Sequence, residues 1–220
     1  FGKYQQTEPS PDRHNKEVIP ADEPALRIMT SQDQAGSLMA VWDRDNTRRD
    51  IFDSMQRKEV YATTGTRIRV RVFAGWDFEA DEVSRHDFVA EGYKRGVPMG
   101  GDLSKAPKGK APSFMVRALR DPDGANLDRV QIIKGWLDDK GETQERIYDV
   151  AVSDGRKIGE DGRSKTPVGT TVDIEKATYT NTIGDAILAA HWTDPDFDAK
   201  ESAFYYVRVL EIPTPRWTTY

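Results

Sequence analysis

The chain has 220 residues, with 37 acidic and 32 basic side chains and a formal net charge of −5. That length can build one large domain or two small ones with a proper core. The negative charge excludes an overall basic field that would attract nucleic acid or anionic lipid, and no apolar run is long enough to span a bilayer. The absence of cysteine excludes disulfides, thiolate metal sites and a cysteine nucleophile, and it fits either a reducing or an oxidising compartment.

The N-terminal region lacks a regular hydrophobic period. Residues 1–35 are polar and interrupted by prolines, which predicts a long loop. Residues 36–42 form a small apolar patch that we expect to pack. The chain starts at Phe1, with neither an initiator methionine nor a signal-peptide pattern. Our hypothesis is therefore that it is an internal piece of a longer protein.

A helix is predicted over residues 47–58, because apolar side chains recur there at helical spacing. Asp45 or Asn46 is the expected N-cap, since short polar side chains accept hydrogen bonds from the first free backbone N–H groups. A short β-branched and aromatic strand, residues 60–64, follows directly.

The clearest strand signal lies at residues 67–73, where three arginines alternate with Ile68, Val70 and Val72. A period of two is typical of a strand with two different faces. We interpret the arginine face as solvated, with an anion site as the alternative. Trp76 lies just beyond, where it either stacks on a ligand or seals the sheet; we prefer the second interpretation.

The remaining chain predicts a β-rich domain. The glycine-rich residues 75–112 are expected to be an irregular excursion with one helical turn near 88–94, and residues 153–165 a long hairpin loop. Segment 186–192 is either a strand or a buried helical turn. Strands are predicted at 113–120, 129–137, 145–152, 170–179, 186–192 and 204–212. Many short strands, few helices and no repeat predict an antiparallel sandwich for residues 66–220.

A core can be predicted from the same alternation. Adjacent residues such as Tyr206 and Val207 point to opposite faces of a strand, so they cannot both face inward. The core is expected to draw, in some register, on Ile68, Val70, Val72, Met115, Val130, Ile132, Ile147, Val150, Tyr206 and Val207.

Side chains that could bind a metal are scattered. His14, His86 and His191 have no ligand spacing such as His-x-His. We interpret each as a surface or packing histidine, and we expect His191, in its apolar run, to make a hydrogen bond in the core. The sequence therefore predicts no metal ligand within this chain.

Two aspartate clusters place carboxylates at alternate positions, as calcium loops do. The first joins Asp121 and Asp123 to Asp128, and the second runs from Asp194 to Asp198. Neither has the glycine and glutamate of an EF-hand. We interpret both as solvated turns, because aspartate is a preferred turn residue.

Several long blocks resemble a known family. These are LMAVWDRDNTRRDIFDSMQRKEVYATTGTRIRVRVFAGWDF at 38–78, GVPMGGDL at 96–103, RALRDPDGANLDRVQIIKGW at 117–136 and YYVRVLEIPTPRW at 205–217. Together they resemble the bacterial family of domain of unknown function 3604 (DUF3604) over nearly the whole chain. That family is similar to the polymerase-and-histidinol-phosphatase (PHP) superfamily of metal-dependent hydrolases, especially its carbaryl-hydrolase-like branch. The resemblance implies a parent enzyme with a distorted α/β barrel and a His-rich centre for Zn, Mn or Fe.

The chain departs from that pattern in one respect. The family's His-x-His and Ser-Asp-Ser/Thr-His motifs would lie upstream, so no metal ligand or cofactor site is carried over to these residues. The resemblance then implies that residues 1–65 are the C-terminal segment of a PHP-like barrel, with residues 66–220 as an appended β-sandwich-like domain. The expected fold class is α+β, mainly β, and the expected partner is the N-terminal barrel of the same polypeptide.

This placement suggests a candidate site. If helix 47–58 is a crossover, strand 60–64 is a parallel barrel strand with a right-handed connection, and its end opens onto the face where such barrels build their sites. The candidate rim residues are Thr63, Thr64, Gly65, Arg67 and Trp76. In the alternative, which we prefer, the glycine only supplies a turn and the threonines are strand formers.

Two functions follow as hypotheses. In the first, the parent is a metal-dependent hydrolase that cleaves a small-molecule phosphoester, other ester, carbamate or amide, and this fragment is inert alone. In the second, the segment is a β-sandwich with a binding or structural role and no catalytic activity of its own. Neither involves nucleic acid or a membrane span. The lack of cysteine and the habit of the family favour a periplasmic or secreted protein, with a cytoplasmic one as the alternative; the oligomeric state stays open.

Overall fold

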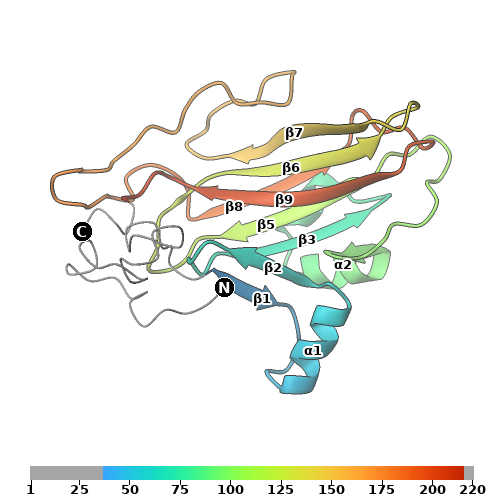
Figure 1. The fold of residues 1–220 in the computed structure, drawn as a ribbon, viewed down its shortest axis with the longest axis horizontal. Coiled ribbons are helices and arrows are strands. Elements are labelled where there is room, and N and C mark those ends of the chain that lie inside the picture. The colour runs from blue at the N-terminus through green and yellow to red at the C-terminus, as the bar shows by residue number, and fades with distance from the viewer. Residues whose placement is uncertain (1–36, 216–220) are drawn as a thin grey trace, which may run out of the picture.

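The computed structural model describes residues 37–215, so the predictions for the loop at 1–35 and for His14 lie outside the described residues. The fold is mainly β (Figure 1). Its elements are β1 (Leu38–Val41), α1 (Arg48–Gln56), β2 (Val60–Thr63), β3 (Arg69–Gly75), the 3-10 helix η4 (Ala80–Ser84), α2 (Phe88–Arg95), β4 (Gly96–Pro98), β5 (Ser113–Leu119), β6 (Leu127–Leu137), β7 (Thr143–Val152), β8 (Ile187–Thr193) and β9 (Ala203–Glu211). None of the helices over this range is long and apolar enough to cross a membrane.

Two antiparallel sheets form the sandwich. One has the strand order β4-β3-β5-β8 and the other the order β7-β6-β9. A separate pair, β1 and β2, lies beside them (Figure 1). The predicted α+β, mainly β class with a sandwich-like domain is confirmed.

The main core lies between the two sheets and follows the predicted period of two. Ile68, just before β3, and Val70 of β3 meet Val130 and Ile132 of β6, and all four are buried. Of the adjacent residues Tyr206 and Val207, Val207 packs against this core, whereas Tyr206 is 45% exposed. The prediction of Tyr206 as a core residue is wrong, because the pleat of β9 turns the Tyr206 side chain to the outer face.

A second core covers the opposite face of the four-stranded sheet. Phe73 of β3 and Met115 of β5 pack there against Phe88 of α2 and Val83 of η4. Gly92 permits this close approach, since a Cβ atom at that position would lie 2.4 Å from the Phe73 ring. The helical turn predicted near 88–94 is thus confirmed as α2, which closes this face.

Three local predictions need correction. The N-cap of α1 is Thr47, not Asp45 or Asn46, because the Thr47 hydroxyl accepts a hydrogen bond from the Asp50 N–H at 3.2 Å. Segment 170–179 is not a strand and holds only an isolated bridge between Asp173 and Thr178. Its alternation has no sheet to pack against, and Ile174 is 78% exposed. Within the predicted excursion at 75–112, the short strand β4 pairs with β3.

The connection through α1 also differs from the expected crossover. β2 pairs antiparallel with β1, with Val41 opposite Val60, and the Trp42 N–H donates to the Glu59 carbonyl at 3.1 Å to extend the ladder. The chain therefore reverses direction through α1. Among the described residues, the prediction that strand 60–64 is a parallel strand reached by a crossover is wrong. The assignment of residues 1–65 to a PHP-like barrel stays a prediction.

The arginine face of β3 is not uniformly solvated. Arg69 is exposed, but Arg71 is buried, and its Nη1 atom lies 3.1 Å from a Glu59 carboxylate oxygen. Its guanidinium lies over the Trp42 ring, 4.4 Å from the centroid, and Tyr93 donates to Glu59. Arg71 thereby joins the β1–β2 pair to the sandwich through an ion pair and cation–π contacts.

A second buried ion pair lies inside the sandwich. The Lys134 Nζ atom is 2.8 Å from the Asp194 carboxylate, and their side chains are 2% and 0% exposed. Lys134 also donates to the Asp196 carbonyl at 2.7 Å, and the Tyr205 hydroxyl donates to Asp194 at 2.6 Å. Because all these donors and acceptors are paired, the segment after β8 is fixed to the inner face of β6.

We predict that Lys134→Ala lowers the free energy of unfolding by about 3–5 kcal/mol, since it leaves a buried carboxylate without its cation. Lys176→Ala is the control, because its ion pair with Asp173 is mostly exposed and should contribute less than about 1 kcal/mol. Urea titrations followed by tryptophan fluorescence measure both values. Equal losses in the two variants would contradict this account.

Candidate functional site

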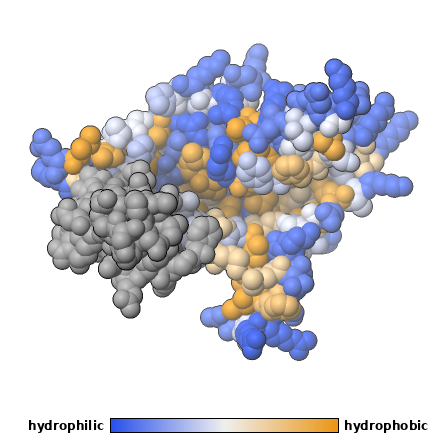
Figure 2. Space-filling view, viewed as in Figure 1, coloured by the Kyte–Doolittle hydropathy of each residue, from blue (hydrophilic) through white to orange (hydrophobic). Residues whose placement is uncertain are grey.

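A groove of about 1190 Å³ opens between the two sheets, along β3 and β9. β9 is the edge of the three-stranded sheet, whereas the four-stranded sheet continues past it to β3 and β4. The inner face of β3 is therefore only partly covered, and Val72 and Ala74 on that face are half-buried. Figure 2 shows hydrophobic residues gathered in this hollow between largely hydrophilic outer surfaces.

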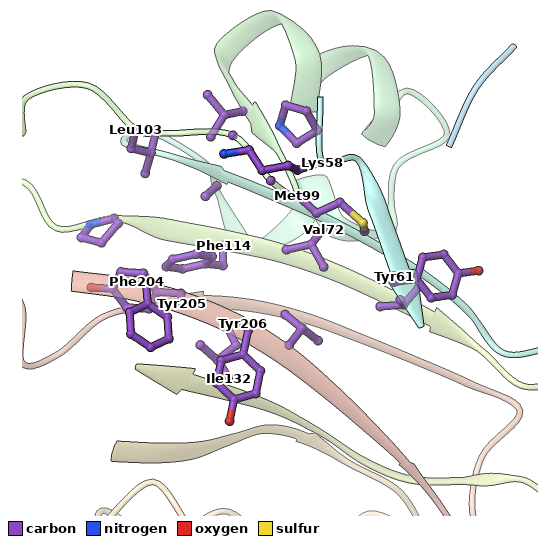
Figure 3. Close-up of a pocket in the computed structure, with 18 of the residues that line it drawn as sticks. Lys58, Tyr61, Val72, Met99, Leu103, Phe114, Ile132, Phe204, Tyr205 and Tyr206 are labelled. Atoms are coloured by element: carbon purple, nitrogen blue, oxygen red, sulfur yellow. The ribbon is translucent and has the colours of Figure 1, made fainter. Parts of the chain in front are cut away.

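The walls of the groove come from distant parts of the chain. β9 forms one side along its whole length, β2 forms the other, and residues 97–106 contribute at the end near Lys58. Figure 3 shows Val72 and Phe114 of the four-stranded sheet on one side of the hollow and Tyr205 of β9 on the other. The site is mainly apolar, as ligand sites usually are.

Aromatic rings close one end. The Phe114 and Tyr205 centroids are 4.8 Å apart, and burial raises the pKa of the Tyr205 hydroxyl, which donates to Asp194. Trp76 lines the groove and contacts the Phe197 ring with a centroid distance of 6.0 Å. This contact favours the sealing role for Trp76, although the ring also reaches the hollow.

Threonines lie at the opposite end. Thr63, Thr64 and Thr66 line the groove, but the Thr63 hydroxyl donates to the Thr66 carbonyl at 2.5 Å and accepts from the Gly65 N–H at 3.4 Å. Gly65 has φ of 128°, a conformation that requires glycine. The turn between β2 and β3 therefore uses part of the predicted rim for its own hydrogen bonds.

Arg67, the remaining rim candidate, serves the same turn through its backbone. Its N–H donates to the Asp121 carboxylate at 2.7 Å, which ties the start of β3 to the β5–β6 turn. Neither Arg67 nor Gly65 lines the groove, whereas Thr63, Thr64 and Trp76 do. The structure thus brings three of the five candidates to one hollow, with Trp76 at the opposite end from the threonines.

Glu211 lies at the threonine end and was missed by the sequence analysis. It ends β9 and lines the groove, and its Oε1 atom is buried without a hydrogen-bond partner. Burial, and secondarily the nearby Asp121 carboxylate, raise the pKa of Glu211 to about 7, while a hydrogen bond from Thr66 partly offsets the rise. The only signal was an acidic residue at the end of a strand whose other residues, apart from Arg208, are apolar or aromatic.

The His, Asp and Glu side chains of the described residues do not form a ligand set for a metal ion. Within residues 37–215, no three or more His, Cys, Asp or Glu side chains are placed to hold a metal ion. His86 is exposed, while His191 is half-buried and makes the predicted hydrogen bond, with its Nε2 atom 2.8 Å from the Phe78 carbonyl. Asp121 and Asp194 belong to turns, but they are buried and bonded rather than solvated. A divalent metal bound by residues outside this chain stays a prediction.

We predict that the stability of the fold falls as the pH rises through the pKa of Glu211. A folded pKa of about 7, above the ordinary 4.5, means that protonation stabilises the folded state. This contribution is complete below pH 4.5 and is lost as the pH rises through about 7. Glu211→Gln should therefore reduce the fall in melting temperature between pH 5 and pH 8.

The matched control is Glu175→Gln, which changes an exposed glutamate outside the groove. Thermal unfolding followed by circular dichroism at both pH values gives the comparison. The same pH dependence in wild type and Glu211→Gln would rule out this role for the carboxyl group.

Comparisons with known proteins bear on the whole chain. No curated protein and no solved structure matches it significantly. A family model described as "Protein of unknown function (DUF3604)" matches residues 1–220. The resemblance seen in the sequence blocks is thereby confirmed at the level of the family, and the chain belongs to the DUF3604 family.

Proposed function

We propose that residues 37–215 act as a non-catalytic binding domain, whose groove accepts a ligand with an apolar body. One observation carries this proposal: the inner face of β3 is left partly uncovered opposite β9, in a hollow of about 1190 Å³. An uncovered apolar surface in a hollow is typical of a binding site. A sandwich that binds no ligand would cover this surface with its own side chains.

The polar groups at the groove favour binding over chemistry. The Thr63 hydroxyl is engaged in its own turn, and the Tyr205 hydroxyl is bonded to Asp194. Glu211 adjoins the Asp121 carboxylate, and the side chains that shift its pKa are Asp121 and Thr66, neither of which is a histidine. A nucleophile with an adjacent base, the usual requirement for covalent catalysis, is therefore not assembled in this part of the chain.

For the whole protein we propose a second function, metal-dependent hydrolysis. Its support is the family match over residues 1–220 together with the resemblance of that family to the PHP superfamily. A barrel formed by other residues of the polypeptide would bind Zn, Mn or Fe and a small-molecule substrate. In that arrangement the sandwich is an accessory domain. Thr64, at the threonine end of its groove, then contacts the small-molecule substrate.

We predict that the chain binds 1-anilinonaphthalene-8-sulfonate in the groove and that Val72→Glu weakens this binding at least tenfold, because a carboxylate on the apolar floor must be desolvated. Val89→Glu is the control: Val89 is on α2, is 42% exposed and does not line the groove. A fluorescence titration measures both affinities, and circular dichroism verifies the fold. Unchanged affinity in Val72→Glu would show that the probe binds elsewhere.

We also predict that the isolated chain is catalytically inert, because its described residues offer no metal-binding cluster. Purified protein with added manganese or zinc should not hydrolyse a generic phosphoester such as p-nitrophenyl phosphate above the buffer rate. Metal-dependent turnover that persists through a second purification would contradict both this prediction and the non-catalytic proposal.

A further inference from the structure

β9 presents an unprotected strand edge to the groove. Within residues 37–215 it pairs only with β6, so the backbone N–H and C=O groups along its other edge have no strand partner. Edge strands usually carry lysine or proline, which prevent pairing with another chain. β9, AFYYVRVLE, has neither. Its charged residues are Glu211 at its end and Arg208, whose side chain donates to Gln131 of β6 at 2.9 Å; Phe204 and Tyr206 are 63% and 45% exposed. This edge is therefore suited to accept another strand.

β2 forms the opposite side of the groove. Its described strand partner is β1, and all four of its residues line the hollow. In Figure 1, β9 and β2 both run towards the same end of the molecule, and β5 and β3 are seen between them. One segment inserted between them can therefore run antiparallel to both strands.

The floor of the groove has the periodicity of a strand. Val70, Val72 and Ala74 project from β3 at every second position and line the hollow. All nine residues of β9 line it too, which at about 3.3 Å per residue corresponds to a length of roughly 30 Å. An extended segment placed over this floor would direct every second side chain into it.

Strand addition at the β9 edge by a second copy of the chain fits this geometry poorly. The β9 of another copy belongs to a three-stranded sheet, and β2 occupies the side of the groove where the remaining strands would have to lie. A single extended segment meets no such obstruction. It would gain backbone hydrogen bonds at its edges and bury apolar side chains on the floor.

We propose that the groove takes up one extended polypeptide segment, with apolar side chains at alternate positions, as an additional strand between β9 and β2. This inference rests on the proposed binding function and names its ligand class. Main-chain hydrogen bonds to β9 and β2 supply affinity, and the β3 floor selects the alternating side chains. The added strand continues the three-stranded sheet and covers the exposed inner face of β3.

The test uses the 220-residue chain and a synthetic peptide of alternating valine and threonine with lysines at both ends. The control peptide has the same sequence with alternate backbone nitrogens methylated, which removes hydrogen-bond donors and keeps the apolar side chains. Isothermal calorimetry measures affinity, and hydrogen exchange identifies the protected amides. The unmodified peptide should slow exchange in β9 and β2, and the methylated peptide should bind at least tenfold more weakly.

The protein variants separate groove binding from general effects. Val72→Glu on the floor should weaken peptide binding at least tenfold, whereas Val89→Glu, away from the groove, should leave the affinity unchanged. Melting temperatures of both variants verify that they are folded. If Val72→Glu does not fold, Ala74→Ser at the same floor supplies the comparison, with a smaller expected loss.

Three outcomes would overturn strand addition. If both peptides bind equally, the groove recognises apolar surface without backbone pairing. If the anilinonaphthalenesulfonate probe binds and neither peptide does, the proposed binding function stands and its ligand is not a strand. If exchange in β9 slows with rising protein concentration alone, and sedimentation shows a dimer, a second copy occupies the edge.

Discussion

The unequal width of the two sheets is the constraint on which this structure depends. Strands bury one face against a facing sheet, and here four strands meet three. β5 and β8 lie over β6 and its neighbours and complete the core there. β3 and β4 extend beyond the last facing strand, so the apolar inner face of β3 is left partly open. The groove thus follows from the number of strands in each sheet, and β2 and residues 97–106 complete its walls.

Buried ion pairs hold the remaining pieces to this scaffold. Arg71 with Glu59 fixes the β1–β2 pair against β3, and Lys134 with Asp194 fixes the segment after β8 against β6. Removing a charge from water has a large desolvation cost, which such pairs offset fully only when all their donors and acceptors are bonded, and the buried Arg71 Nε atom has no hydrogen-bond partner among the described residues. Their contribution is therefore to specify one arrangement of the parts: β2 is held at the side of the groove, and Tyr205 is held at its aromatic end.

The groove has two chemically different ends. At one end Trp76 contacts Phe197, while Phe114 and Tyr205 pack together. At the other, threonines adjoin Glu211, whose raised pKa reflects burial beside Asp121. This polarity gives a bound ligand a preferred direction. It also places Glu211, whose pKa is raised to about 7, where the β2–β3 turn and the end of β9 meet.

The sequence by itself determined the elements whose signals are local. The alternation in residues 67–73, the helical spacing in α1 and the turn residues between strands predict a mainly β sandwich, because each depends on neighbours within a few positions. Only the tertiary structure decided which faces are covered. A period of two shows that Arg69 and Arg71 share a face, but not that Trp42 and Glu59 cover one of them. The antiparallel pairing of β2, the exposure of segment 170–179 and the position of Glu211 likewise depend on contacts between distant residues, which no local pattern records.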